Sequence, residues 1–198
     1  MFTAYLHVNG KQLEWKNNMP VIGTTLRELS QRGDSVRRLL RPISKVEGGP
    51  AWGNRTGSGN YIIGTHDGSP PSSDFREWRF ATSNSSMRAM YFECWKEYGR
   101  GRFYLFQAYL SLFQVDRLKT EREFIALHCD PDEPDNSPHS TYKKGPHLHI
   151  LVADHPLPHA HIALNRGQLE AVLSSPQSIS NAIGLALHMI REEILDAI

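Results

Sequence analysis

The sequence predicts a single α+β domain whose sheet is mainly antiparallel. The 198 residues suffice for one sizeable domain and hardly for two. Extended segments follow one another with short turns between them, and the helical patterns stand apart from these runs, which is typical of α+β proteins. The predicted sheet combines an N-terminal hairpin with a C-terminal meander of four strands, and helices pack against it.

Composition and charge narrow the class of protein. Hydrophobic residues make up 39% of the chain and charged residues 22%, as in ordinary globular proteins. The formal net charge is +1 with neutral histidines, so no overall field attracts nucleic acid or an anionic membrane, although a local basic face could still bind nucleic acid. The N-terminal segment lacks the features of a signal peptide, and no run of about 18 apolar residues occurs. We therefore expect a cytoplasmic protein without a membrane span, in which Cys94 and Cys129 are reduced.

The N-terminal third predicts a hairpin followed by two short helices. Residues 3–16 alternate between apolar and polar side chains around Asn9-Gly10, a strong hairpin-turn signal. A capping-box sequence predicts a helix over 25–31 that ends at a glycine, and a second helix is predicted over 36–40. The basic residues of this region are Arg27, Arg32, Arg37, Arg38, Arg41 and Lys45. We interpret them as the solvent-exposed face of the helices, and a phosphate-binding patch is the alternative.

The middle of the chain predicts a loop, a strand and a helix. The segment at about 48–73 is rich in Gly, Pro and Ser and predicts a long surface loop. Residues 75–82 alternate well enough for a strand. Apolar side chains then recur at steps of three and four residues over 87–98, which predicts an amphipathic helix that begins at one of two serines.

The C-terminal half predicts the meander. Residues 102–115 are apolar on both faces, as expected of a central strand that is covered on both sides. The next strand is predicted over 123–129, and a polar loop separates it from a hairpin of strands 148–153 and 159–164. Two helices complete the chain, over 165–173 and 179–198.

Histidines gather in this last hairpin. Side chains two residues apart in a strand point to the same face, so the two histidines of each His-x-His pair share a face. If Ala153 pairs with His159, then His149 pairs with Ala163, and both pairs lie on one face; a slip of one residue would separate them. The segment 143–163 holds five of the ten histidines: His147, His149, His155, His159 and His161.

This pattern predicts a metal site. Neutral imidazole is the commonest protein ligand for ions such as Zn²⁺ and Mn²⁺. We predict that His147, His149 and His161 bind a divalent ion (Zn, Mn or Mg), and that His128 or Asp130 from the preceding strand serves as a further ligand or base. Three histidines and a carboxylate leave a position for water or a substrate oxygen, the arrangement of a catalytic metal site.

A short motif carries a family resemblance. The segment 145–151 (GPHLHIL) resembles the His-hydrophobic-His strand of the HUH single-strand endonucleases and relaxases, and the tripeptide 128–130 (HCD) is similar to the His-x-Asp element of relaxases. The resemblance implies that the paired histidines bind a divalent ion that polarises a scissile phosphate, while a tyrosine attacks. The loop between the two elements is longer than in that family. No tyrosine follows the hairpin, so Tyr5 and Tyr142 are the positional candidates for a nucleophile.

Two function classes follow from these observations. The first is a metal-dependent hydrolase that processes phosphodiesters in nucleic acid or a nucleotide, with loop 48–73 and the basic segment 37–45 facing the substrate. The second is a non-catalytic adaptor or subunit of a protein complex, whose histidine-rich face binds a protein partner. Four histidines on adjacent strands favour the first class, whereas the low net charge and the lack of a clear nucleophile favour the second.

Overall fold

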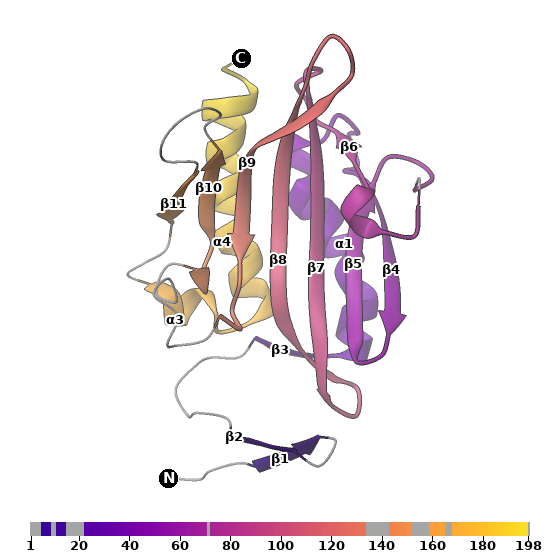
Figure 1. Ribbon diagram of the computed structural model, residues 1–198, viewed down its shortest axis with the longest axis vertical. Helices are drawn as coiled ribbons and strands as arrows, with labels where there is room; N and C mark the ends of the chain where they lie inside the picture. Colours follow the sequence, from indigo (N-terminus) through magenta and orange to yellow (C-terminus); the bar gives the residue numbers. More distant parts are fainter. Residues whose placement is uncertain are drawn as a thin grey trace.

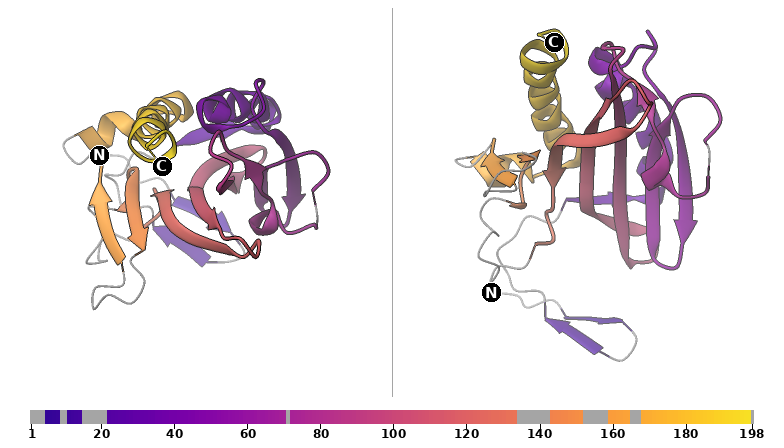
Figure 2. Two further views of the ribbon diagram at one scale, coloured as in Figure 1. Left: turned by 90° about the horizontal axis from the view of Figure 1, so that it is seen from above. Right: turned by 45° about the horizontal axis from the view of Figure 1, so that its top comes forward.

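The computed structural model places a large antiparallel sheet of nine strands against two long helices, which confirms the predicted fold class. Helices α1 (Leu26–Leu40) and α4 (Pro176–Ile190) lie side by side on the same face of the sheet (Figures 1 and 2). No helix in the described part of the chain is long and apolar enough to cross a membrane. The structure describes residues 5–8, 11–14, 22–70, 72–133, 143–151, 159–164 and 168–197. Within these ranges, residues 5–8, 11–14, 151 and 159–161 are described by their backbone alone.

The strands of the main sheet follow the order β11-β10-β9-β8-β7-β5-β4, and every neighbouring pair is antiparallel. Two short strands lie off this path, where β3 pairs with β8 and β6 pairs with β7. The bounds of these strands and of the shorter helical elements are β3 Gly23–Thr25, η1 Arg41–Ile43, β4 Ala51–Gly57, β5 Asn60–His66, η2 Phe75–Glu77, β6 Phe80–Ala81, β7 Met87–Gly99, β8 Arg102–Val115, β9 Glu121–Cys129, β10 His147–Leu151, β11 His159–Ala163, α3 Leu169–Val172 and η4 Arg191–Leu195.

A separate two-stranded sheet confirms the predicted N-terminal hairpin. It consists of β1 (Tyr5–Val8) and β2 (Lys11–Glu14), which pair antiparallel. Val8 pairs with Lys11, so two residues connect the strands, as in the predicted Asn-Gly turn. Those two residues lie outside the described part of the chain.

The hydrophobic core lies between the two helices and the adjoining face of the sheet. Because side chains alternate along a strand, every second residue of β7 to β10 points away from the helices. The four cross-strand partners Phe92, Tyr109, His128 and His147 form one such row. We call this second side of the sheet the histidine face. The helices contribute to the core mainly Leu29, Val36, Leu40, Ile179, Ile183, Ala186 and Ile190.

The predicted helix over 87–98 is wrong, because this segment forms strand β7. Its apolar residues fit a helical repeat, but they also fill both faces of a strand. Tyr91 and Trp95 are buried in the core on the helix side, and Met90, Phe92 and Cys94 alternate with them and are buried too. A continuous apolar run of this kind is typical of a strand that is covered on both faces.

The predicted loop over 48–73 is also wrong in large part. Strands β4 and β5 pair over seven residues each, and β5 pairs in turn with β7. Gly53 and Gly64 are directly opposite each other, and a Cβ at either position would press on the indole ring of Trp78. Gly59, in the turn between the strands, has a φ of 74°. The glycines that indicate a loop in the sequence therefore have two other roles. One allows the tight turn between the strands, and two leave room for the side chain of Trp78.

One helix replaces the two predicted between residues 25 and 40. The predicted capping box is confirmed, since the Thr25 side chain accepts a hydrogen bond from the Glu28 backbone and Glu28 accepts one from the Thr25 backbone. The helix continues through Gly33, which was predicted to end it. A Cβ at Gly33 would overlap the indole ring of Trp52, so packing, and not helix termination, explains this glycine.

This packing gives a prediction with a matched control on the other helix. We expect Gly33→Ala to lower the free energy of unfolding by about 1–3 kcal/mol, because the Trp52 ring must shift to admit the methyl group. We expect Gly184→Ala in α4 to raise it by up to about 1 kcal/mol, the gain in helix propensity. The new Cβ there meets Leu39 at an ordinary 3.5 Å. Urea unfolding of both variants measures the effects, and a change of the same sign in both would contradict this account.

The remaining elements differ from prediction mainly at their boundaries. Segment 75–82, predicted as one strand, contains the short turn η2 and the two-residue strand β6. Of the helix predicted over 165–173, the described residues form only α3. Helix α4 begins earlier than predicted, capped by Ser175, and a π-helical turn follows it. These differences leave the histidine-bearing strands in the predicted order.

Candidate metal centre

Strands β9 and β10 bring three histidines together on the histidine face. His128 in β9 is the cross-strand partner of His147 in β10, and His149 lies two residues further along the same strand. The intervening Leu127 and Leu148 pair on the opposite side and belong to the core. Alternation therefore anchors both strands with leucines and leaves the three imidazoles together on the other face.

The three imidazoles can hold a metal ion. Each of His128, His147 and His149 offers one ring nitrogen, and these three nitrogens all lie within 4.8 Å of one another. The ring centroids of His128 and His149 are 4.0 Å apart, and those of His147 and His149 are 4.9 Å apart. Ligand nitrogens of a tetrahedral zinc ion, at about 2.0–2.1 Å from the metal, lie about 3.4 Å from one another. Small rotations of the side chains would close the difference.

The backbone fixes the ring of His147 in a tautomer that suits metal binding. Its Nδ1 lies 2.9 Å from the carbonyl oxygen of Gly145, which can only accept a hydrogen bond. Nδ1 therefore carries the hydrogen, and the lone pair of the neutral ring is on Nε2. The side chain is fully buried. Histidine ligands of metals are commonly oriented by such a bond from the second nitrogen.

A carboxylate and a tyrosine adjoin the three histidines. Oδ2 of Asp130 lies 4.0 Å from Nε2 of His147. Tyr109 donates a hydrogen bond from Oη to Oδ1 of Asp130 at 2.7 Å. The ring of Tyr109 also stacks on His128, with centroids 3.9 Å apart and planes 15° from parallel. Tyr109 thus contacts both the carboxylate and one of the imidazoles.

Burial changes the ionisation of this pair. It raises the pKa of Asp130 to about 6, although the hydrogen bond from Tyr109 partly opposes the shift. Burial, together with the bond to Asp130, raises the pKa of Tyr109 well above its usual value. Tyr109 therefore stays protonated and acts as a hydrogen-bond donor near neutral pH. The two side chains also line an open cleft of about 390 Å³, with Asp132, Glu133 and Lys143.

The structure brings together four of the five predicted site residues. His128, His147 and His149 form the cluster, and Asp130 lies beside it. The backbone of His161 pairs with His149, but its side chain lies outside the described residues.

The register of the hairpin differs from the prediction. His159 pairs with Leu151 and not with Ala153, a shift of two residues. An even shift preserves the parity of the strands, so both His-x-His pairs still occupy positions on one face.

Other predictions about the site are wrong or concern residues that the structure does not describe. The basic segment 37–45 comprises the end of α1 and the turn η1, which pack with α4 on the helix side of the sheet, so it does not face the histidines. Tyr5 has no described side chain, and Tyr142 lies outside the described residues. Tyr109 was missed, since nothing in the local sequence of β8 distinguishes it from the neighbouring aromatic residues.

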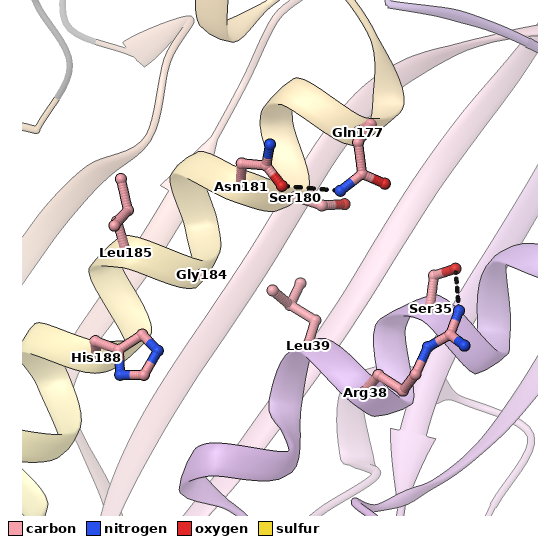
Figure 3. A pocket seen from close by; sticks show the side chains of 9 residues that line it. All are labelled: Ser35, Arg38, Leu39, Gln177, Ser180, Asn181, Gly184, Leu185 and His188. Atoms are coloured by element: carbon pink, nitrogen blue, oxygen red, sulfur yellow. Dashed lines mark hydrogen bonds between the residues drawn. The ribbon is translucent and has the colours of Figure 1, made fainter.

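A second hollow lies between α1 and α4, on the side of the sheet away from the histidines. Figure 3 shows its lining, in which Gln177 donates a hydrogen bond to Asn181 and Arg38 donates one to Ser35. The exposed His188 stands at one end of the group. These described side chains contain no metal-ligand cluster, so the histidine face is the stronger candidate for chemistry.

Comparison of the chain with models of known protein families, with curated proteins and with solved structures gives no match. The three histidines, with Tyr109 and Asp130 beside them, are thus the features from which a function can be inferred.

Proposed function

We propose that the protein is a metal-dependent enzyme that cleaves phosphodiester bonds in single-stranded nucleic acid. The observation that carries this proposal is the convergence of His128, His147 and His149 from two adjacent strands. Three nitrogen ligands favour Zn²⁺ or Mn²⁺ over Mg²⁺, which prefers oxygen ligands. Three protein ligands also leave a coordination position for a water molecule or a substrate oxygen.

The residues around the triad have roles that fit this chemistry. A divalent ion held there would supply a Lewis acid for a phosphate oxygen. The Gly145 carbonyl keeps the ring of His147 in the tautomer that presents Nε2. Asp130 lies beside that nitrogen, where a carboxylate can accept a proton from a bound water molecule. The motif-level resemblance of 145–151 to the HUH endonucleases supports the same class of reaction.

The rest of the histidine face supports a single-stranded substrate. Beside the triad, β8 presents half-buried aromatic rings that include Phe106 and Phe113. Two cations lie over these rings, with Lys96 Nζ 3.2 Å from the ring centroid of Phe106 and the guanidinium carbon of Arg79 4.0 Å from that of Phe113. Aromatic rings stack with unpaired bases, and Lys96 would neutralise a phosphate, whereas Arg79 is already paired with Glu121 at 2.9 Å. A strand that crosses β8 would place its backbone near the histidines of β9 and β10.

Cleavage of a fluorescent single-stranded oligonucleotide tests the proposal. We expect the purified protein to cleave DNA or RNA of this form with Zn²⁺ or Mn²⁺ and to lose the activity in EDTA. We expect Phe106→Ala to weaken substrate binding by about 1–3 kcal/mol, roughly 5- to 150-fold, because one base loses its stacking partner. Leu185→Ala is the control, since this exposed leucine lies on α4, on the other side of the sheet.

One outcome would reject the proposed cleavage, and another would reject the proposed position of the substrate. A protein that binds metal but cleaves neither DNA, RNA nor an activated phosphodiester would favour the non-catalytic adaptor, for which the histidine face is a binding surface. Equal loss of binding in Phe106→Ala and Leu185→Ala would remove the support for a substrate on β8.

A further inference from the structure

We propose that Tyr109 is a positioning residue that holds the Asp130 carboxylate away from the metal and so keeps one coordination position open. The proposal rests on the metal centre put forward above. It explains how an acidic side chain can lie beside that centre without becoming a ligand. Its basis is the placement of Asp130 between two competing partners, the hydroxyl of Tyr109 and an ion held by the histidines.

The distances define this competition. Two ligand atoms on one tetrahedral ion lie about 3.4 Å apart. Oδ2 of Asp130 is 4.0 Å from Nε2 of His147, and a small side-chain rotation would close this distance, as it would those between the triad nitrogens. Oδ1 accepts the 2.7 Å hydrogen bond from Tyr109. A modest rotation of the carboxylate would make it a fourth ligand, and the bond from Tyr109 opposes that rotation.

The position of Tyr109 is itself well defined. Its ring stacks on His128 and makes an edge-type contact with Phe92, with centroids 5.2 Å apart. Phe92 is buried, and it contacts Phe75 of the η2 turn. The tyrosine is therefore held on two sides, and its hydroxyl can act as a fixed donor toward Asp130.

An open position matters for the reaction. If the carboxylate took the fourth position of a tetrahedral ion, the metal would be bound more tightly, but a phosphate oxygen or water could enter only as a fifth ligand. With the carboxylate held at the edge of the site, the oxygen acceptor stays close to that position without occupying it. With Tyr109 in place, the three histidines bind the metal, and the fourth coordination position stays open to the substrate.

The test uses Co²⁺, whose visible spectrum reports the ligands around it, and azide as a probe of the open position. We expect azide to change the spectrum of the Co²⁺-loaded wild-type protein. We expect Tyr109→Phe to bind Co²⁺ about 10-fold more tightly and azide about 10-fold more weakly, since Asp130 takes the fourth position. The double variant Tyr109→Phe with Asp130→Asn should bind azide like the wild type.

A control and a second variant make the interpretation firm. Tyr104→Phe removes another hydroxyl of β8, one that donates to Asp132 at 3.5 Å, and should leave both affinities unchanged. Asp130→Asn alone should also bind azide like the wild type, because the carboxylate is not a ligand while Tyr109 holds it. A loss of Co²⁺ affinity of more than about 100-fold in Asp130→Asn would identify Asp130 as a resident ligand and overturn the proposal.

The remaining outcomes separate this proposal from that of the metal centre. If Tyr109→Phe keeps Co²⁺ and binds azide like the wild type, Tyr109 has no positioning role, and the metal centre stands. If Tyr109→Phe loses Co²⁺ while Tyr104→Phe retains it, Tyr109 supports His128 and does not restrain Asp130. If the wild-type protein binds no Co²⁺, both proposals fail together.

Discussion

Arg32→Met should lower the free energy of unfolding by about 3–5 kcal/mol, because it leaves a carboxylate without its cation in the protein core. Glu93 is fully buried on β7, and Arg32 of α1 binds it through two hydrogen bonds of 2.7 and 2.8 Å. Tyr91 and Trp95 donate to the same carboxylate at 2.7 and 2.9 Å. Arg32 also donates to Ser180 of α4, so one guanidinium links both helices to the sheet.

The ionisation of Glu93 depends on these donors. Burial alone would raise the pKa of the carboxyl group, but the charge of Arg32 and the hydrogen bonds lower it below the usual value. A lowered pKa in the folded state contributes stability that is present above the unfolded-state pKa of about 4.3 and is lost as the pH falls through the folded-state value. Removal of Arg32 reverses this relation, because Glu93 can then avoid a buried charge only by taking up a proton.

Thermal and urea unfolding of Arg32→Met at neutral pH measures the cost. The matched control is Arg76→Met, because the ion pair of Arg76 with Asp74 lies at the surface and should contribute little. Natural domains are stable by about 5–15 kcal/mol, so the core variant is expected to be close to unfolding at 37 °C. A loss of less than about 1 kcal/mol would mean that water reaches Glu93 in the folded protein.

The same ion pair shows why part of the fold escaped prediction. The predicted helix over 87–98 rested on apolar residues at steps of three and four, and nothing in that pattern places Glu93 in the core. Glu93 occupies an inward position only because Arg32 lies opposite it, 61 residues away in the chain. Similarly, β4 and β5 are poor in apolar residues, and their stability depends on pairing with β7 and on packing under Trp78. Such long-range partners are not visible in a local pattern.

The candidate site was more predictable because its signal is local. Alternation along a strand is a property of the backbone, so the paired histidines of β10 share a face in any register. The tripeptide 128–130 lies at the end of β9, and β10 pairs antiparallel with that strand so that His147 lies opposite His128. Whether His128 lies next to His147 depends on the register between β9 and β10, which the sequence alone left open. Tyr109 required the pairing of a further strand, β8 with β9.

His147→Ala should weaken Zn²⁺ binding by well over 100-fold. Loss of a group that merely supports a ligand typically costs about 10–100-fold in metal affinity, and loss of a ligand itself costs more. His147 is the most deeply buried of the three histidines, and its orientation is set by the Gly145 carbonyl. Its removal leaves two imidazoles, which do not enclose an ion. Cleavage of the single-stranded substrate should fall with the metal content.

Titration of the purified variants with Zn²⁺ by calorimetry, alongside metal analysis, measures the effect. His188→Ala is the matched control, since it removes an exposed histidine of α4 on the other side of the sheet. His147→Gln offers a second variant that fills more of the buried space with an uncharged side chain, in case the alanine variant is unstable. Wild-type affinity for Zn²⁺ in both His147 variants would show that the described triad is not the metal centre, and the proposed chemistry would then have no site on β9 and β10.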